Sequence, residues 1–441
     1  MKENQIFVFE FVSGGGFSQV DIPSSLFCEG YGMLRCIIAD FKALNFDIST
    51  LLDERIAFLS KYLDSDDISL VSLQDDYIKV FKESIKECEY CFIIAPEFSN
   101  ILYDLTKIAD ENNKKILSVG LKGIKLGTSK IKTFNFFKKM KISTPRTFII
   151  PFKHNALDID FIIKKYHDLK RPIVIKPNDG VGAESIFYFE NEGQISEFFQ
   201  ESHEKIDRSR MCILQEFIDG EDMSASLIGY PSNMERQQAN PAILSINSQD
   251  INIKDANRES EYFGGNTPVV EHEEITTELS EMLEKLNFSG LGGYYGLDFI
   301  RNKDKKIHFI EINPRLTTSY IGVRNIIDSN PASLILNSIF YASEPIEINR
   351  NRHSTFLRLE LKYKGNDRIP QIRDSVIPHL MEEIPELITP PISFDNLEQK
   401  YINFSCFIAT RETNFDKSSD RIQEITKYLQ KMDFDIVKKP T

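Results

Sequence analysis

The sequence lacks the features that would attach it to nucleic acid or to a membrane. It has 53 Lys and Arg against 66 Asp and Glu, a formal net charge of −13, whereas nucleic-acid phosphates are bound by basic faces. It has no run long and apolar enough to span a bilayer. Its first residues lead straight into a strand-like run and lack the pattern of a signal peptide. We therefore expect a cytoplasmic protein that acts on small molecules and binds neither nucleic acid nor a membrane.

Cysteine is also scarce, with 6 residues in a chain of 441. Without an export signal, these cysteines are expected to be free thiols. Cys88 and Cys91 form one C-x-x-C pair, but no second pair lies nearby and no histidine stands at zinc-finger spacing. This pattern favours a reduced, structural pair over a zinc site or a redox pair.

The length and the order of elements indicate several α/β units. A chain of 441 residues is long enough for about two to four domains. Strand-like and helix-like runs alternate at the start of the chain, which predicts a mostly parallel sheet flanked by helices. The strand-like runs cover 6–11, 46–51, 68–71, 90–94 and 116–119, and the helix-like runs cover 25–43, 53–63, 76–87 and 99–112.

Three further units are expected after a first domain of residues 1–120. Residues 121–209 contain a helix with a basic face and a strand–glycine loop–strand pattern. Residues 210–345 are rich in strand-like runs and end in a helical stretch. Residues 346–441 form another α/β piece, with the strands "FLRLELKY" and "INFSCFIAT" and the helix "SSDRIQEITKYLQKM".

Three consecutive glycines, Gly14, Gly15 and Gly16, follow the apolar run "FVFEFV". The dinucleotide fingerprint is G-x-G-x-x-G opening a helix, but Gln19 occupies the third glycine position and no helix starts there. A Rossmann dinucleotide site is therefore not expected. Ligands of open α/β sheets bind at the ends of such strands, so a substrate contact and a plain turn both stay open.

The most informative stretch is a predicted β-hairpin, in which "YYGLDFI" and "IHFIEIN" flank the polar turn "RNKDKK". If the turn centres between Asp304 and Lys305, Asp298 lies opposite Glu311, with Cβ atoms about 4.5–5.5 Å apart. Asn313 points to the same face, because side chains two residues apart share a face. Two carboxylates this close repel unless a proton or cation lies between them, and hard oxygen ligands suit Mg²⁺. The alternative is an ordinary polar hairpin face.

Two lysines and a glycine loop precede this hairpin. Lys130 follows "GTS" and Lys176 follows the strand "PIVI", and each is a compact cation that could bind a phosphate or could lie solvated at the surface. Gly180 and Gly182 follow in "NDGVGAES". Glycine lets backbone N–H groups approach phosphate closely, although hairpin turns also commonly carry glycine.

A hinge-like segment, "LQEFIDGED", lies between the glycine loop and the hairpin. An apolar strand ends at Gln215 and Glu216, and an acidic turn from Asp219 to Asp222 follows. Such a hinge could present backbone groups to an adenine and a carboxylate to a ribose. The alternative is a strand followed by an acidic turn.

The order of these motifs resembles that of the ATP-grasp superfamily over about residues 120–342. The resemblance implies an α/β and α+β chain: an ATP-grasp fold, a Rossmann-like pre-ATP-grasp domain before it and an additional C-terminal α/β segment. It implies a carboxylate–amine ligase that holds ATP between two α+β lobes with Mg²⁺, or Mn²⁺ as an alternative. In this resemblance Lys130 and Lys176 bind phosphate, a mobile lid runs from Asp179 through Gly180, Val181 and Gly182 to Glu184, and Gln215, Glu216, Phe217, Ile218 and Asp222 form the adenosine cradle. Asp298, Glu311 and Asn313 are then the magnesium ligands, and Arg315 stabilises the transferred phosphoryl group, with Arg315 and Lys176 as catalytic residues.

A narrower resemblance is carried by "IIAPEFSNILYDLTKIAD", "FEFVSGGG", "CEGYGMLRCIIADFKAL" and "NPRLTTSYIGVRN". These segments resemble the tyramine–glutamate ligases of methanofuran biosynthesis and their bacterial relatives. The resemblance implies that ATP phosphorylates the γ-carboxylate of glutamate and that an aromatic amine attacks the acyl phosphate. The chain departs from the archaeal pattern after Glu347, which leaves open both the amine and the amino acid, with tyrosine and polyglutamate as other acceptors.

Several residues near these motifs have two interpretations. Gly14, Gly15 and Gly16, in the domain that helps bind the acceptor in this superfamily, are candidate substrate residues. Thr317, Thr318 and Ser319 follow Arg315 and could contact substrate, but we expect them to cap a helix. Arg258 could reach the triphosphate or lie in a solvated loop.

Two rival functions and the oligomeric state also stay open. A biotin-carboxylase-like or carbamoyl-phosphate-type enzyme would activate bicarbonate on the same fold. A nucleotide-sensing protein with a degraded site is disfavoured by the intact set of lysines, metal ligands and arginine. A homodimer is the default expectation for a soluble enzyme.

Overall fold

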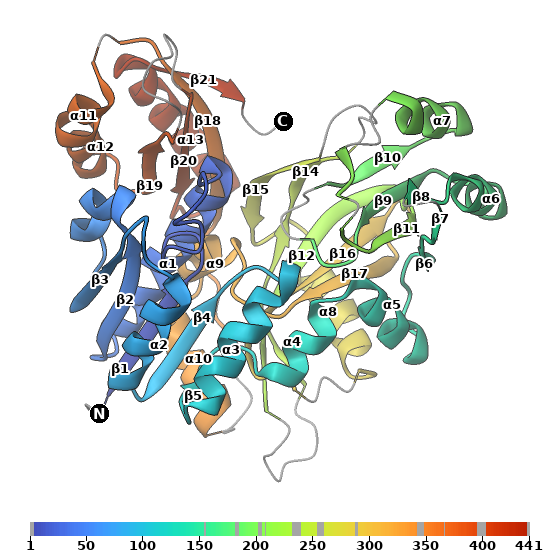
Figure 1. Ribbon diagram of the computed structural model, residues 1–441, viewed down its shortest axis with the longest axis horizontal. Coiled ribbons are helices and arrows are strands. Elements are labelled where there is room, and N and C mark those ends of the chain that lie inside the picture. Colours follow the sequence, from blue (N-terminus) through green and yellow to red (C-terminus); the bar gives the residue numbers. More distant parts are fainter. Residues whose placement is uncertain are drawn as a thin grey trace.

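The computed structural model describes residues 4–153, 156–180, 185–201, 205–207, 209–231, 240–253, 260–286, 290–341, 348–365, 367–394 and 403–438. These residues form four main sheets, of five, four, four and six strands, and one two-stranded hairpin (Figure 1). Within the described part of the chain, no helix combines the length and apolar character needed to cross a membrane.

The first sheet confirms the predicted parallel α/β domain. Its strand order is β3-β2-β1-β4-β5, and every pair is parallel. Helices on both faces bury the central strand β1 along its whole length, which is why it reads as a continuous apolar run. The strands are β1 (Gln5–Glu10), β2 (Asp47–Asp53), β3 (Asp67–Val71), β4 (Tyr90–Ile94) and β5 (Lys115–Ile116), with helices α1 (Ser24–Lys42), α2 (Tyr77–Glu87) and α3 (Ile101–Glu111).

Two of the predicted elements differ from the structure. The stretch predicted as a helix over 53–63 is the 3₁₀ helix η1 (Glu54–Tyr62), interrupted by non-helical backbone at Ile56. The last predicted strand is only two residues long, because the chain turns at 117–120 into helix α4 (Leu121–Gly127).

A second sheet forms a small lid with an apolar core of its own. Its antiparallel strands are ordered β10-β9-β11-β6, and its core, which includes Phe187 and Phe198, is separate from the core shared by the rest of the molecule. Because β11 pairs with β9, the lid continues past Arg210, where the next unit was predicted to begin. The elements are β6 (Thr147–Ile149), β9 (Ile173–Pro177), β10 (Phe187–Phe189), β11 (Cys212–Glu216), α6 (Ile159–Leu169) and α7 (Glu192–Glu201), with the short hairpin β7 (Phe152–Lys153) and β8 (Ala156–Leu157).

A third sheet lies at the centre of the molecule and contains the predicted hairpin. Its order is β13-β12-β16-β17, with α5 packed on β17 and α8 on β13. The elements are β12 (Gly220–Gly229), β13 (Ala242–Ser248), β16 (Gly293–Asn302), β17 (Ile307–Asn313), α5 (Lys130–Lys139), α8 (His272–Leu283), α9 (Tyr320–Ile326) and α10 (Pro331–Phe340).

The register of this hairpin confirms that Asp298 lies opposite Glu311. The turn itself is centred on Asp304, since the Asn302 N–H donates to the Lys306 carbonyl, half a residue from the predicted centre. A regular ladder from this turn would place residue 310 opposite Asp298. A register shift next to Asp298 adds one residue to β17, so that Glu311 takes that place.

The C-terminal segment does not form a sheet alone. Strands β14 (Asp250–Asn252) and β15 (Glu261–Thr267) join it to give the order β14-β15-β18-β20-β19, with β21 also paired to β18. Residues from the central part of the chain are therefore integral to this sheet. The C-terminal elements are β18 (Ser354–Tyr363), β19 (Leu387–Ile392), β20 (Asn403–Ala409), β21 (Phe434–Lys438), α11 (Ile369–Gln371), η4 (Ile372–Val376), α12 (Ile377–Glu383) and α13 (Phe415–Lys431).

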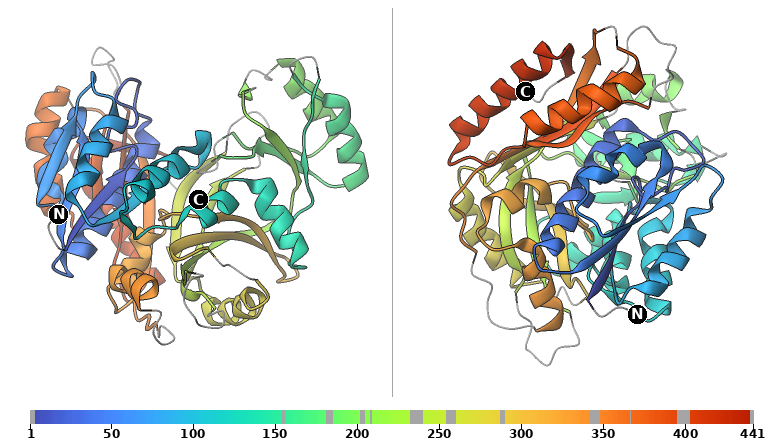
Figure 2. Two further views of the ribbon diagram at one scale, coloured as in Figure 1. Left: turned by 60° about the horizontal axis from the view of Figure 1, so that its bottom comes forward. Right: turned by 90° about the vertical axis from the view of Figure 1, so that its left-hand side faces the viewer.

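Helix α1 lies between the first sheet and the C-terminal sheet (Figure 2). On one side it packs against β1, and on the other against β19 and β20. Arg35 donates to the carbonyls of Leu387 and Ile388 at 3.0 and 2.8 Å, and Thr389 donates to the Cys28 carbonyl at 2.8 Å. The helix is therefore buried from both sides and holds the two sheets at a defined separation.

The six cysteines are all free and buried, as predicted. Cys88 Sγ and Cys91 Sγ lie 3.6 Å apart, at the end of α2 and the start of β4. The C-x-x-C pair is a reduced, buried pair in the core of the first domain.

Candidate active site

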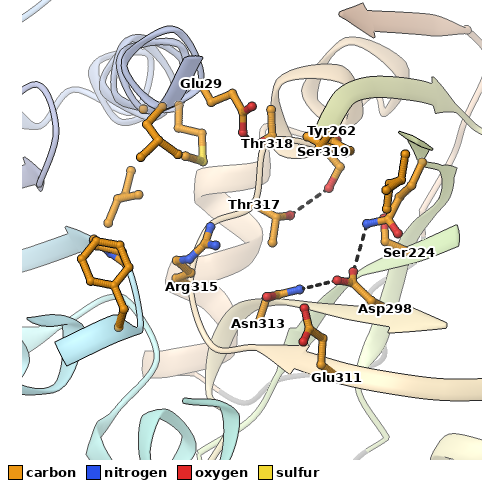
Figure 3. A pocket seen from close by; sticks show the side chains of 18 of the residues that line it. Glu29, Ser224, Tyr262, Asp298, Glu311, Asn313, Arg315, Thr317, Thr318 and Ser319 are labelled. Carbon is orange, nitrogen blue, oxygen red and sulfur yellow. Dashed lines mark hydrogen bonds between the residues drawn. The ribbon is translucent and has the colours of Figure 1, made fainter. Parts of the chain in front are cut away.

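A cavity lies where the first domain, the lid and the central sheet meet (Figure 3). At one end it is lined by the face of the β16–β17 hairpin and by Lys176 from the lid. At the other end it is lined by α1 and by the segment that follows β4. The two ends are named here the acidic end and the acceptor end, and the turn from Asn313 to Ser319 passes between them.

The acidic end brings together the three predicted metal ligands. Asn313 Nδ2 donates to Asp298 Oδ2 at 2.9 Å, and Gln249 Nε2 donates to Asp298 Oδ1 at 3.2 Å. Burial and the neighbouring charge of Glu311 raise the pKa of Asp298 to about 7. Burial alone would raise the pKa of Glu311 too, but Lys130 and Lys176 outweigh it and hold that pKa below its usual value. The two carboxylates thus share a site that favours a proton or a cation between them.

The two predicted phosphate lysines converge on this acidic end from different elements. Lys130 begins α5, and its Nζ lies 2.7 Å from Glu311 Oε2 and donates to the Gly180 carbonyl at 2.7 Å. Lys176 lies on β9, and burial lowers its pKa to about 8. Asn178 connects the two, because its carbonyl and side-chain oxygens accept from the first N–H groups of α5. Asn178, two residues after Lys176, therefore positions the start of α5 and with it Lys130.

The lid segment after Lys176 reaches the first domain. Asp179 pairs with Arg210 at 2.9 Å and also accepts from the Ser99 N–H at 3.3 Å. Val181 and Gly182, with the rest of the predicted glycine lid to 184, lie outside the described residues, as does Arg258.

The predicted adenosine cradle is divided between the lid and the cavity. Asp222 lines the cavity. Gln215 Nε2 donates to Thr147 Oγ1 at 2.9 Å, and Glu216 pairs with Arg146 at 2.8 Å. These two side chains are therefore engaged by partners inside the lid. Phe217 packs edge-on against Tyr188 at 4.8 Å, and Ile218 is buried beside it.

Arg315 lies in the turn between the two ends of the cavity. Its Nε lies 3.0 and 3.1 Å from the two oxygens of Glu97, which follows β4 in the first domain. Its Nη1 donates to the Leu316 carbonyl at 3.1 Å. Two fixed partners therefore hold the guanidinium at the cavity wall.

The three residues expected to cap a helix line the cavity instead. Ser319 precedes α9, but its side chain makes no capping bond. Its hydroxyl lies 2.8 Å from Thr317 Oγ1 (Figure 3) and 3.2 Å from Ser226 Oγ, and the buried Tyr294 hydroxyl joins the same group. Thr318 donates to Glu29 on α1 at 3.0 Å. The prediction that these residues cap a helix is wrong, because their hydroxyls form hydrogen bonds with other side chains at the cavity wall.

The glycine run after β1 forms the turn that Glu10 organises. The Glu10 carboxylate accepts from the Val12 N–H and from the Ser13 N–H and hydroxyl. A Cβ on Gly14 would come within 2.6 Å of the Glu10 carbonyl and the Phe9 ring, and Gly15 has φ +90°. Gly14, Gly15 and Gly16 are not among the described cavity-lining residues, whereas Val12 and Phe17 beside them are. The turn alone accounts for the glycines.

Sequence reasoning missed several residues that line or support the cavity. Glu10 stands at the end of a buried strand and Glu29 interrupts the apolar stripe of α1, and each is a sequence signal. No local signal marks the others. The missed residues are Glu10, Glu29, Glu97, Ser224, Gln249 and Tyr262.

Two family models match the chain across these elements. Residues 128–319 match the ATP-grasp domain and residues 46–124 match the pre ATP-grasp 3 domain. The chain belongs to the ATP-grasp superfamily. In this ATP-grasp protein the first match contains both lysines and the whole acidic end, and the second contains Glu97. The predicted family and fold class are confirmed.

Curated relatives and solved structures agree with this assignment. The chain is 28% identical over 326 residues to a tyramine–L-glutamate ligase of Methanocaldococcus jannaschii, covering 72% of this chain and 84% of that relative. It is 29% identical over 329 residues to the tyramine–L-glutamate ligase of Methanocaldococcus fervens, covering 72% and 89%. The biotin carboxylase domain of Hydrogenobacter thermophilus 2-oxoglutarate carboxylase, in complex with MgADP, ADP and bicarbonate, has a TM-score of 0.67 at 12% identity, covering 98% of this chain and 90% of that structure. At such identity the likeness shows the fold alone.

Proposed function

We propose that this ATP-grasp protein is an ATP-dependent carboxylate–amine ligase that forms an amide through an acyl phosphate and releases ADP and phosphate. We propose the γ-carboxylate of glutamate as the acyl donor and tyramine or a related aromatic amine as the acceptor, for methanofuran-type cofactor biosynthesis. The names of two relatives that align with most of the chain support these substrates.

The observation that carries the proposal is the convergence of Lys130 and Lys176 on the paired carboxylates Asp298 and Glu311. Both lysines are buried, and a buried cation needs an anionic partner. The lysines fit the phosphates of ATP, and the carboxylates fit the cation that accompanies them. The same cavity continues to α1 of the first domain, so phosphoryl transfer and acceptor binding share one enclosure.

The acidic end fits a divalent cation. In the described part of the chain, no three acidic, histidine or cysteine side chains are grouped around one metal position. The cation would therefore be held by Asp298, Glu311 and the amide oxygen of Asn313, with substrate oxygens and water completing its shell. When bound, Mg²⁺, or Mn²⁺ in its place, would neutralise charge on the phosphate oxygens.

The residues then have separate roles in two steps. In the first, a carboxylate oxygen attacks the γ-phosphorus and the bond to the β–γ bridging oxygen breaks. Lys176 and Lys130 bind the phosphates during this step. Gly180, Val181 and Gly182 cover them, Ile218 and its neighbours hold the base, and Asp222 holds the ribose.

In the second step, the amine nitrogen attacks the acyl carbon, phosphate leaves and the nitrogen loses its proton. Arg315 offsets the charge of the acyl phosphate and of the departing phosphate. Thr317 and Ser319 line the wall beside it. The protein contributes position and charge, as in other phosphoryl transfers.

The proposal is tested by measuring ADP release with ATP and Mg²⁺. The arms are glutamate alone, glutamate with tyramine, glutamate with tyrosine, and bicarbonate. We expect release that requires both glutamate and an aromatic amine and that is lost in Glu311→Ala. Release with bicarbonate alone would instead assign a bicarbonate-activating enzyme, and ATP binding without release in any arm would point to a nucleotide sensor.

A further inference from the structure

The acceptor end of the cavity has an acidic and an apolar component. Its apolar wall includes Leu26 and Met33 of α1 and Phe98 beyond β4. Its carboxylates are Glu10 and Glu29. This combination suits an organic cation with an apolar body more than it suits a second anion.

Glu29 is held at the cavity wall by partners from two other parts of the chain, and Figure 3 shows one of them, Thr318. Thr318, in the turn before α9, donates to Glu29 Oε2 at 3.0 Å. Arg358, on β18 of the C-terminal sheet, lies with Nη1 3.5 Å from Glu29 Oε1. The carboxylate is fixed in direction but is not enclosed, since 13% of the side chain stays exposed and it lines the cavity.

The positive charge of Arg358 is shared between Glu29 and a second carboxylate. Its Nε lies closer to Glu360, at 3.0 Å from Oε1, and its guanidinium lies over the Phe263 ring at 5.3 Å. One guanidinium therefore faces two carboxylates, Glu29 and Glu360, and the group keeps a negative charge.

The charges that line the cavity also favour a cation at the acceptor end. Among the described residues that line it, five are carboxylates and two are cations, Lys176 and Arg315. Lys176 belongs to the acidic end, and Arg315 is paired with Glu97. Burial raises the pKa of Glu29, despite Arg358. A buried carboxylate without full compensation is costly, and a bound cation would offset that cost.

Glu10 is the weaker candidate for the same role. Both of its carboxylate oxygens are occupied by the turn that follows β1, through the Val12 N–H and the Ser13 N–H and hydroxyl. Glu29 makes one short hydrogen bond and one longer ion pair, so it has more capacity for a further donor.

We propose that Glu29 binds the ammonium group of an organic substrate whose apolar body lies against Leu26, Met33 and Phe98. This inference rests on the proposed ligase function. It also assigns a role to the C-terminal sheet, which positions Glu29 through Arg358 and so takes part in selecting the substrate. The ammonium group could belong to the amine acceptor or to the amino group of the carboxylate donor, and the apolar wall favours the acceptor.

The test uses Glu29→Gln, which keeps the shape and the bond from Thr318 but removes the charge. Its control is Glu111→Gln, which removes a carboxylate at the exposed Lys107–Glu111 pair of α3 and is not among the described cavity-lining residues. Amide formation from glutamate and tyramine is measured beside hydroxamate formation from glutamate and hydroxylamine. Hydroxylamine is uncharged at neutral pH and needs no ammonium site.

We expect Glu29→Gln to raise the KM for tyramine about tenfold or more, the loss typical of a charge-assisted hydrogen bond. Hydroxamate formation and the KM for ATP should stay within about twofold, and Glu29→Asp should recover part of the loss. Glu111→Gln should leave the KM for tyramine, the KM for ATP and hydroxamate formation within about twofold. A rise in the KM for glutamate in the hydroxamate assay would assign the ammonium to the donor. Unchanged KM values for both substrates would overturn the proposal.

Calorimetry separates a failure of this inference from a failure of the proposed function. Tyramine and its amine-free analogue 4-ethylphenol are titrated into wild type and Glu29→Gln without turnover. If no carboxylate gives hydroxamate, the ligase proposal fails, yet preferential binding of tyramine that is lost in Glu29→Gln still supports the ammonium site. Equal binding of both compounds by wild type, together with an unchanged KM for glutamate in Glu29→Gln, would reject that site.

Discussion

The Arg315 guanidinium and the Glu97 carboxylate form a buried ion pair between the ATP-grasp part and the domain before it, with Nε 3.0 Å from Oε1. Because Glu97 follows β4 and Arg315 follows β17, the pair sets the position of Arg315 relative to the acceptor end. In the proposed mechanism, it therefore couples catalysis to the placement of the first domain.

Glu97→Gln is expected to lower both stability and turnover. Removing one partner of a buried pair leaves an uncompensated charge, so the free energy of unfolding should fall by about 2–4 kcal/mol and kcat by about tenfold. Denaturant unfolding and steady-state kinetics check this. The matched control is Glu111→Gln, at the exposed Lys107–Glu111 pair of α3, which should change stability by less than about 0.5 kcal/mol. Equal effects of the two substitutions would contradict a positioning role for Glu97.

Asp298→Asn should lower the activity without lowering the stability of the metal-free protein. In the absence of metal it removes the repulsion between two buried carboxylates, so the melting temperature should rise or stay unchanged. With Mg²⁺ and ATP, the loss of a ligand should lower kcat/KM about a hundredfold or more. A large loss of stability without metal would show that Asp298 has a structural role instead.

The pH dependence of stability follows from the raised pKa of Asp298, about 7 in the folded protein. Because the folded state binds this proton more tightly than the unfolded state does, the contribution of Asp298 is present below pH about 4 and is lost as the pH rises to about 7. The metal-free protein should therefore lose stability relative to Asp298→Asn across this range. Saturating Mg²⁺ should remove the difference in slope, and a slope that Mg²⁺ leaves unchanged would count against a metal at this carboxylate.

Lys130→Met and Lys176→Met should each raise the KM for ATP by about tenfold to a hundredfold, since each removes a buried phosphate-binding charge. Lys132→Met, on the exposed side of α5, should leave the KM within about twofold. Lys130→Met should also lower stability without ATP, because Glu311 loses its ion-pair partner. Titration with ATP and thermal unfolding provide the readouts, and a KM shift in Lys132→Met as large as the others would argue against a specific role.

Sequence patterns predicted the part of the site whose residues lie close together in the chain. The alternation around Asp298 and Glu311 and the turn between them predicted a pairing that the structure confirms, because hairpin register depends on residues close in sequence. Even here the register shift beside Asp298 was not visible. The predicted turn centre was half a residue too late, which displaces the pairing by one residue, and the one-residue shift in β17 cancels that displacement.

The acceptor end depends on contacts that no local pattern contains. Glu29, Thr318 and Arg358 come from three distant segments and meet only because α1 is buried between two sheets. The pairing of β15 with β18 is likewise long-range, so the C-terminal piece was expected as a separate unit. The order of motifs predicted an adenosine-binding role for Glu216, yet its side chain pairs with Arg146 inside the lid.

The burial of α1 from both sides has a consequence for synthesis of the chain on the ribosome. The helix, Ser24–Lys42, can dock on β1 once β4 has emerged, but β19, Leu387–Ile392, emerges roughly 350 residues later. At about 5–20 residues per second, its second apolar face waits on the order of 20–70 s for its cover. The first domain can thus begin to fold long before α1 is covered on both faces, and the wall that carries Glu29 takes its final form only after β19 has emerged.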